Sequence, residues 1–126
     1  MKLNSDLNPG VNTVTGYGAG YVAVNGRRYE RSLIVERNRI DTDWPAASAA
    51  ALSAELLAPL AARQCDVLLL GTGERQRFPS PALLRPLIEA RIAVEVMDTG
   101  AACRTYNVLL AEGRNPLAVL IVEAAP

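Results

Sequence analysis

The chain has 126 residues, 50% of them hydrophobic, and its 13 basic residues balance 13 acidic ones. This length predicts one folded domain over residues 1–126, and the balanced charge excludes a global attraction to nucleic acid or to an anionic membrane. Histidine is absent and Lys2 is the only lysine. Because the commonest general base and the commonest metal ligand are missing, we expect no bound metal and no cofactor.

The beginning of the chain has no apolar run typical of a signal peptide, and Asp6 lies where transit peptides avoid acidic residues. Residues 1–19 are rich in Asn, Gly, Thr and Ser, which predicts an extended lead-in without a helix. Cys65 and Cys103 stand far apart and form no metal-binding spacing. No run approaches the roughly 20 apolar residues of a membrane span. We therefore expect no membrane insertion and a cytoplasmic location.

Two β-prone runs follow, Gly20–Val24 and Arg28–Val35, separated by Asn25-Gly26. Asn-Gly predicts the turn of an antiparallel hairpin, because both central residues of a type I′ turn need positive φ. The second run alternates, with Tyr29, Leu33 and Val35 on one face and Arg28, Glu30 and Ser32 on the other. This alternation predicts a sheet with one side facing water.

The segment Ile40–Pro45 predicts a short strand that ends at its proline. Ser53, followed by Ala54 and Glu55, predicts the start of a helix, since it supplies a capping hydroxyl and an acidic residue in the first turn. Pro59 falls inside this helix, so we expect a kink or a break there.

Residues 67–122 predict the order strand, helix, strand, helix, strand. These elements are Val67–Leu70, Ser80–Ala90, Ile92–Met97, Thr99–Glu112 and Leu117–Val122. Ser80 with Pro81 is a typical helix entry, and Gly113 is a typical helix exit. Strands apolar on both faces belong in a covered parallel sheet. We therefore predict an α/β fold with a mostly parallel central sheet from the β-α-β-α-β unit and an N-terminal antiparallel hairpin sheet.

Candidate ligand or partner residues gather where the carboxyl ends of these parallel strands are expected, because open α/β sheets bind ligands at that edge. They are Gly71, Thr72, Gly73, Arg75, Arg77, Asp98, Thr99, Gly100 and Arg104. One interpretation is a small pocket for a carboxylate or phosphate at a helix N-terminus. The other, which we favour, is that Thr99 only caps the helix and the glycines only make turns. Gln76 occupies the third glycine position of a dinucleotide fingerprint, so that motif fails.

Cys103 lies near the start of the last predicted helix and beside Arg104, and both the helix dipole and the arginine favour a thiolate, which is a nucleophile. With no histidine to activate it, we favour packing roles for Cys103 and Cys65. A group of arginines around the hairpin, interleaved with Tyr29, resembles an RNA-contacting surface; it comprises Arg27, Arg28, Arg31, Arg37 and Arg39. We favour an exposed, edge-protecting strand face and expect no specific nucleic-acid binding.

The segment Val96–Arg114, together with Leu70–Gly73, is similar to the small Mth-type domain family of unknown function, which includes the mitochondrial respiratory complex I assembly factor three. The shared pattern is a Gly-x-Gly loop, a proline-led helix, a strand ending in Met-Asp-Thr, then Ala-x-x-Thr-x-Asn-x-Leu-x-x-Glu-Gly-Arg. Its later motif positions are Thr105, Asn107, Glu112, Gly113 and Arg114. The chain looks like a bacterial member. The resemblance implies a three-layer β/β/α fold, with helices on one side of the central sheet and a smaller antiparallel sheet on the other.

The resemblance implies no reaction, since no enzyme activity is established for that family, whose eukaryotic member binds other proteins during assembly of a respiratory complex. Three functions stay open: a protein-binding adaptor or assembly factor, which we favour, a small-anion binder at the sheet edge, and a cryptic enzyme. Other proteins are the expected partners, and the sequence leaves open whether the chain forms a homo-oligomer. We assign the motif structural roles: Asn107 and Glu112 bond to neighbouring loops, and Arg114 closes the helix end electrostatically.

Overall fold

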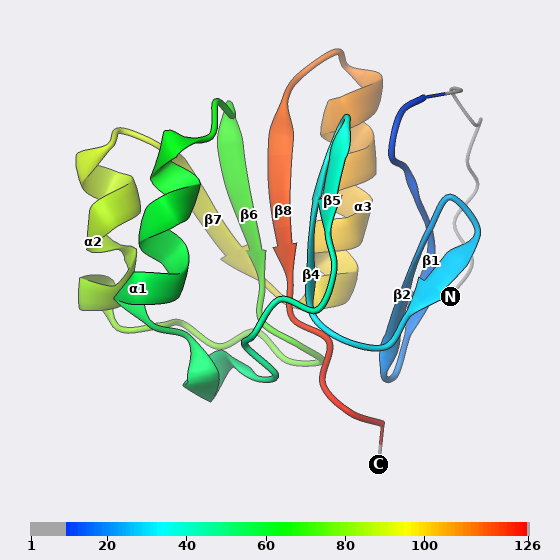
Figure 1. Ribbon diagram of the computed structural model, residues 1–126, viewed down its shortest axis with the longest axis horizontal. Coiled ribbons are helices and arrows are strands. Elements are labelled where there is room, and N and C mark those ends of the chain that lie inside the picture. The colour runs from blue at the N-terminus through cyan, green and yellow to red at the C-terminus, as the bar shows by residue number, and fades with distance from the viewer. Residues whose placement is uncertain (1–9, 126) are drawn as a thin grey trace.

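The computed structural model describes residues 10–125, which form two sheets and the helices that cover them (Figure 1). A three-stranded antiparallel sheet contains β1 (Val14–Gly18), β2 (Tyr21–Val24) and β3 (Arg27–Tyr29). A five-stranded sheet has the order β5-β4-β8-β6-β7, built from β4 (Leu33–Glu36), β5 (Arg39–Asp41), β6 (Val67–Gly71), β7 (Ala93–Met97) and β8 (Pro116–Leu120). The α/β class and the separate antiparallel hairpin sheet are confirmed.

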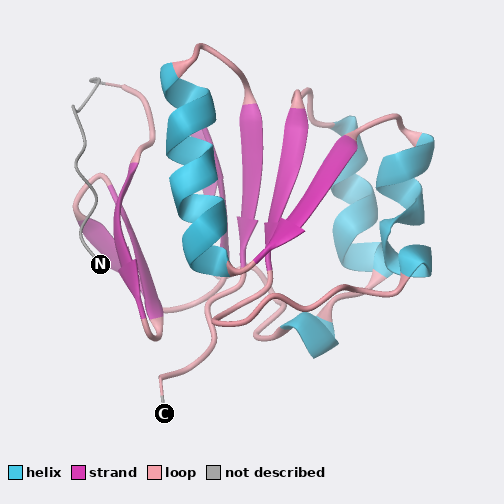
Figure 2. Ribbon diagram, turned by 180° about the vertical axis from the view of Figure 1, so that it is seen from behind, coloured by secondary structure: helices cyan, strands magenta, loops and turns pink. Residues whose placement is uncertain are grey.

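The helices are α1 (Ala54–Leu57), α2 (Pro81–Glu89) and α3 (Thr99–Ala111), with 3-10 turns η1 (Ala49–Ala51) and η2 (Ala58–Ala62). α1 and α2 cover one face of the central sheet through side chains such as Leu57 and Leu87. α3 covers the other face and packs in the same core cluster as Val14, Val22 and Val24 of the smaller sheet. Figure 2 shows the smaller sheet beside α3. Helices therefore lie on both sides of the central sheet, whereas the resemblance implied helices on one side only.

Alternate residues of β6 and β8 serve the two cores. Val67 and Leu69 face the α3 side, while Leu68 and Leu70 face the α1 and α2 side. β6 pairs in parallel with β7 and β8, and β4 pairs antiparallel with β8 and β5. The predicted parallel unit over residues 67–122 is thus present, and the antiparallel strands extend it on one side. Strands buried on both faces explain the unbroken apolar runs.

The segment Arg28–Val35 is not one strand, which corrects the sequence prediction. β3 ends at Tyr29 and β4 starts at Leu33, and the two strands belong to different sheets. Ser32, expected on a water-facing side, is buried at the crossing. Its hydroxyl donates to the Ala46 carbonyl oxygen and accepts from the Val122 N–H. Because both hydrogen-bonding functions are satisfied, a polar residue can occupy this buried position.

The turn at Asn25-Gly26 is confirmed, since both residues have positive φ, 51° and 84°. Within the predicted lead-in, residues 14–18 form β1, which pairs with β2, and residues 1–9 lie outside the described part. The predicted strand at Ile40–Pro45 is shorter and starts earlier, as β5. Ser53 caps α1 by accepting from the Leu56 N–H. The expected break at Pro59 is confirmed, because α1 ends at Leu57 and continues as η2.

Candidate functional site

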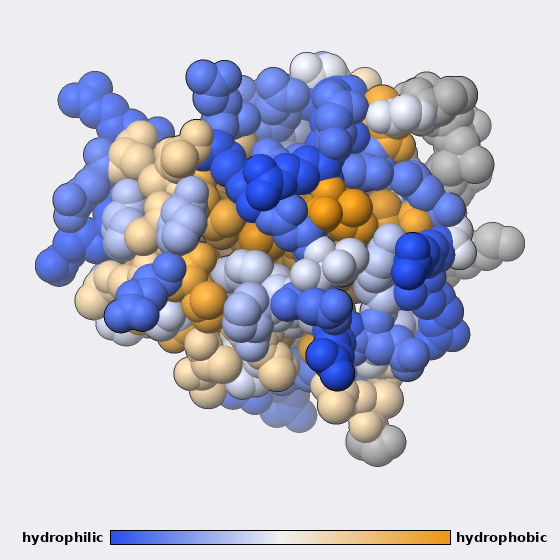
Figure 3. All heavy atoms as spheres, viewed as in Figure 1, coloured by the Kyte–Doolittle hydropathy of each residue, from blue (hydrophilic) through white to orange (hydrophobic). Residues whose placement is uncertain are grey.

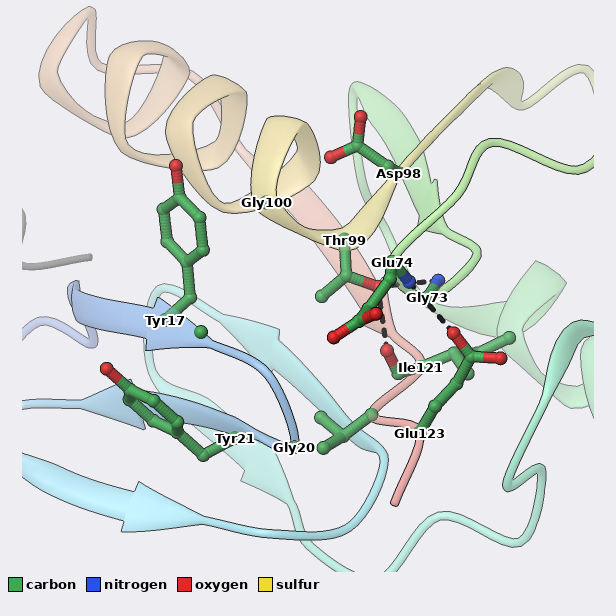
Figure 4. Close-up of a pocket in the computed structure, with 12 residues that line it drawn as sticks. Tyr17, Gly20, Tyr21, Gly73, Glu74, Asp98, Thr99, Gly100, Ile121 and Glu123 are labelled. Atoms are coloured by element: carbon green, nitrogen blue, oxygen red, sulfur yellow. Dashed lines mark hydrogen bonds between the residues drawn. The ribbon is translucent and has the colours of Figure 1, made fainter. Parts of the chain in front are cut away.

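A pocket of about 340 Å³ opens where the smaller sheet meets the carboxyl edge of the central sheet (Figure 4). We call it the edge pocket. Its lining comes from β1, β2, the loops after β6 and β7, the start of α3 and the segment after β8. The lining residues are Tyr17, Gly18, Gly20, Tyr21, Gly73, Glu74, Asp98, Thr99, Gly100, Ile121, Val122 and Glu123. The sequence prediction therefore placed Gly73, Asp98, Thr99 and Gly100 in a common site.

Thr99 joins the three parallel strand ends beneath the pocket. Its hydroxyl accepts from the Gly73 N–H at 2.8 Å and donates to the Ile121 carbonyl oxygen at 2.7 Å. The helix cap is Asp98, whose carboxylate accepts from the Ala101 N–H at 2.8 Å. The prediction that Thr99 caps α3 is therefore wrong. The capping side chain lies one residue earlier because the Thr99 hydroxyl is already engaged by the sheet.

Close packing explains two of the predicted glycines. A Cβ at Gly71 would lie 2.9 Å from the Thr99 Cα. A Cβ at Gly100 would lie 2.7 Å from the ring of Tyr17. Gly73 has a φ of 106°, a backbone region that few residues other than glycine adopt. These glycines let the strand ends, α3 and the smaller sheet approach one another, and that approach forms the pocket.

Three carboxylates line the pocket: Glu74, Asp98 and Glu123. Asp98 is held by its cap bond, and the Glu123 carboxylate accepts from the Glu74 N–H at 2.9 Å. In Figure 4 the side chain of Glu74 extends toward the two tyrosines. No arginine belongs to the lining, taken over residues 10–125. The pocket is therefore acidic, which disfavours the carboxylate or phosphate ligand considered from the sequence.

Tyr17 and Tyr21 form the wall opposite the carboxylates, and the sequence analysis singled out neither as a site residue. Arg104 donates to the Tyr17 hydroxyl, with its guanidinium carbon 5.7 Å from the ring centroid. Arg28 lies over the Tyr21 ring at 3.8 Å. Arg104 thus contacts the pocket wall without lining the pocket. The available signal was the glycine-rich run at residues 16–20, which lies where β1 turns into β2.

Arg75 and Arg77 lie outside the edge pocket, on the exposed loop of residues 72–80. Thr72 shapes this loop: its buried hydroxyl donates to the Arg75 carbonyl oxygen and accepts from the Arg77 N–H. Gln76 donates to the Val96 carbonyl oxygen at 3.0 Å. The same loop carries Phe78, whose side chain is 78% exposed. The predicted site residues therefore divide between a pocket and a neighbouring surface loop.

Cys103 is fully buried, and burial raises the pKa of its thiol to about 12, although Arg104 acts to lower it. Burial also raises the pKa of the half-buried Cys65. A nucleophilic cysteine needs a lowered pKa and access to substrate. Both observations support the packing roles preferred from the sequence.

Asn107 of α3 has a structural role, as the sequence analysis predicted. Its side chain accepts from the Val14 N–H at 3.0 Å and donates to the Val14 carbonyl oxygen at 2.7 Å. Thr105 lies half-buried on α3. At the helix end, the N–H groups of Gly113 and Arg114 donate to Leu110 and Leu109, a Schellman arrangement with Gly113 at φ 77°. Glu112 and Arg114 therefore act here through their backbones.

Two of the hairpin arginines, Arg37 and Arg39, make side-chain hydrogen bonds, while Arg27 and Arg28 lie over tyrosine rings and Arg31 pairs with Asp43. Arg37 donates to the carbonyl oxygens of Leu110 and Arg114 at the end of α3. Arg39 and the half-buried Arg63 pair with Asp41, and Arg63 also pairs with Glu36 at 2.9 Å. Burial acts to raise the pKa of Asp41, but hydrogen bonds from Arg63 and Arg39 lower it below 3.8. These arginines stabilise the fold, which favours the structural interpretation of the hairpin charges.

The described residues contain no cluster of three or more acidic or cysteine side chains that could hold a metal. In the same residues, no helix has the length and apolar character needed to cross a membrane.

A family model described as a protein of unknown function (DUF498/DUF598) matches residues 14–121. The solution structure of a Bordetella pertussis protein, described as a Mth938-like domain, is similar with a TM-score of 0.81 and 35% identity, covering 99% of this chain and 94% of that one. Bos taurus NADH dehydrogenase (ubiquinone) 1 alpha subcomplex assembly factor 3 is 45% identical over 56 residues, which are 44% of this chain and 30% of that protein. A Francisella tularensis 13 kDa major membrane protein is 36% identical over 56 residues, 44% of this chain and 46% of that protein. The chain therefore covers less than half the length of these two curated relatives.

Proposed function

The chain belongs to the DUF498/DUF598 family of proteins of unknown function, and from that premise we propose that it works as a non-catalytic, assembly-factor-like adaptor that binds other proteins. The Bos taurus relative is named an assembly factor. Its match covers 56 residues, which are less than half of this chain. An assembly role for this chain is therefore proposed rather than shown by that match.

One observation carries the proposal: Phe78, the only phenylalanine of the chain, is 78% exposed at the carboxyl edge of the central sheet. A large apolar side chain exposed to water costs free energy, and burial against a partner would recover that free energy. Arg75 and Arg77 are exposed on the same loop. Aromatic residues and arginine are the side chains enriched in protein interfaces. The loop of residues 72–80 therefore supplies a compact anchor for a partner that carries an apolar pocket with an acidic rim.

The state of the candidate catalytic side chains supports an adaptor over an enzyme. Cys103, the nucleophile considered from the sequence, is buried with its pKa raised to about 12. Asp98 is engaged by the α3 cap and the Thr99 hydroxyl by the strand ends. These groups hold the fold together, and none of them is placed to attack a substrate or to activate one.

The test is partner capture from the native cell extract by the tagged full-length chain, with proteins identified by mass spectrometry. We expect Phe78→Ser to reduce recovery of the specific partners at least several-fold. Ile88→Ser is the matched control, because Ile88 is 57% exposed near the opposite end of α2. Equal capture by wild type and Phe78→Ser, with native circular dichroism for both, would overturn the proposal.

The proposed location is the cytoplasm. On the face shown in Figure 3, apolar side chains gather over α1 and α2. The rest of that face is a mixture of hydrophilic and apolar side chains. Cell fractionation provides the check, with recovery in the soluble fraction expected. Recovery in the membrane fraction would contradict this location and would agree with the name of the Francisella relative.

A further inference from the structure

We propose that the edge pocket receives an arginine side chain of a protein partner. This inference rests on the proposed adaptor function and names the chemistry of the group that the partner would insert. It is carried by three features of the pocket: its size, the charge of one wall and the aromatic character of the other.

The volume suits one long side chain. At about 340 Å³, the pocket lies at the lower limit for small-molecule sites, which range from roughly 300 to 1,000 Å³. A dinucleotide or another large cofactor would extend well beyond it. An extended arginine side chain, by contrast, can lie along the floor at Ile121 and Val122 and place its head near the carboxylates.

The charge of the lining selects a cation. Glu74, Asp98 and Glu123 line the pocket without an arginine among the lining residues of the described chain. Asp98 and Glu123 each accept a backbone N–H, whereas the Glu74 side chain extends toward the tyrosines (Figure 4). Glu74 is therefore the carboxylate best placed to accept hydrogen bonds from an incoming cation. The absence of a metal-binding cluster in residues 10–125 disfavours a metal ion as that cation.

The aromatic wall selects arginine over lysine. The rings of Tyr17 and Tyr21 stand across the pocket from Glu74. A guanidinium is planar, stacks on aromatic faces and is less strongly hydrated than an ammonium, so it enters a partly apolar pocket at lower cost. The protein already places Arg28 against Tyr21 and Arg104 against Tyr17, and these contacts hold both rings in position before any ligand arrives.

The floor is also fixed in advance. The Thr99 hydroxyl links Gly73 to Ile121, and a Cβ at Gly73 would lie only 2.5 Å from the Glu123 carboxyl carbon. The carboxylates are therefore set on segments that hydrogen bonds tie together, and the Asn107 side chain ties β1, which carries Tyr17, to α3. A preformed site loses less conformational freedom on binding, which raises its affinity for a single side chain.

The experiment is an NMR titration of the full-length protein with N-acetyl-arginine amide, using N-acetyl-citrulline amide as the uncharged probe of matched shape. We expect arginine to shift the backbone amide signals of Gly20, Gly73 and Gly100 with a millimolar Kd, and citrulline to leave them nearly unchanged. Equal shifts with both probes, or shifts confined to other parts of the protein, would overturn the proposal. Equal affinity for N-acetyl-lysine amide would overturn the selection of arginine.

The variant Glu74→Gln tests the carboxylate, with Glu89→Gln as the matched control, because Glu89 is exposed at the end of α2. Loss of a charge-assisted hydrogen bond should weaken arginine binding about tenfold in Glu74→Gln and not in Glu89→Gln. Unchanged affinity in Glu74→Gln would contradict the assigned role. Because the titration needs no partner, its failure leaves the Phe78 capture test intact, and a failed capture test leaves the titration intact.

Discussion

Thr99 and Gly73 exchange two hydrogen bonds across the carboxyl edge of the central sheet. The Thr99 N–H donates to the Gly73 carbonyl oxygen, and the Gly73 N–H donates to the Thr99 hydroxyl, both at 2.8 Å. Because Thr99 is the first residue of α3 and Gly73 follows β6, this exchange fixes the helix against the strand end and sets the floor of the edge pocket.

We predict that Thr99→Val destabilises the protein by about 1–3 kcal/mol, since it leaves the Gly73 N–H and the Ile121 carbonyl oxygen without their side-chain partner. Urea unfolding followed by circular dichroism measures this change. Thr99→Ser keeps the hydroxyl and should retain most of the stability. Equal stability of Thr99→Val and the wild type would contradict the cross-linking role. A single transition in these curves is expected for one domain.

Asn107 provides the second prediction, because its side chain both donates to and accepts from the backbone of Val14. Asn107→Asp keeps the acceptor but loses the amide donor at neutral pH. We expect a loss of about 1–3 kcal/mol, with the smaller sheet loosened first. Relative to the wild type, the variant should exchange its backbone amide hydrogens faster in β1, with a smaller change in β6. Val108→Ala, at an exposed position of α3, is the control. Unchanged exchange in β1 would show that this pairing does not anchor the smaller sheet.

The third prediction concerns alkaline pH. Burial raises the pKa of Cys103 from its ordinary 9.0 to about 12, so the folded state keeps the thiol proton over a pH range in which the unfolded chain releases it. The stability from this group is complete below pH 9 and is lost as the pH rises toward 12. Cys103→Ala should therefore reduce the slope of stability against pH above 9. The same slope in both proteins would contradict this assignment.

Thiol labelling of the native protein gives a direct measure of the same burial. At pH 8, Cys65 should react with a disulfide reagent well before Cys103, since Cys65 is only half-buried. Rapid labelling of Cys103 in the native protein would contradict its burial and would reopen the enzyme hypothesis.

The sequence predicted what local chemistry decides. Asn25-Gly26 specified its turn because few other residue pairs accept two positive φ values. Ser53 specified its helix start, and Pro59 specified the break after α1. The apolar runs from residue 67 onward specified the parallel strands, since only strands covered on both faces dispense with alternation. These signals each depend on a few neighbouring residues.

The sequence failed where two distant segments decide one residue's role. Ser32 alternates like a water-facing residue, yet Ala46 and Val122 satisfy its hydroxyl and allow its burial. Thr99 resembles a helix cap, yet Gly73 and Ile121 occupy its hydroxyl and leave the cap to Asp98. The local pattern around each residue is compatible with both roles.

Local signals were therefore enough to predict the α/β class, the hairpin, the parallel unit and the edge at which Gly73, Asp98, Thr99 and Gly100 meet. The folded arrangement was needed to learn that Tyr17 and Tyr21 complete the pocket, that Glu74 and Glu123 join Asp98 in its lining, and that Arg75 and Arg77 lie outside it. The succession of strands and helices along residues 67–122 follows from local periodicity. The composition of a pocket, by contrast, depends on how the smaller sheet packs beside α3, a contact between segments more than eighty residues apart.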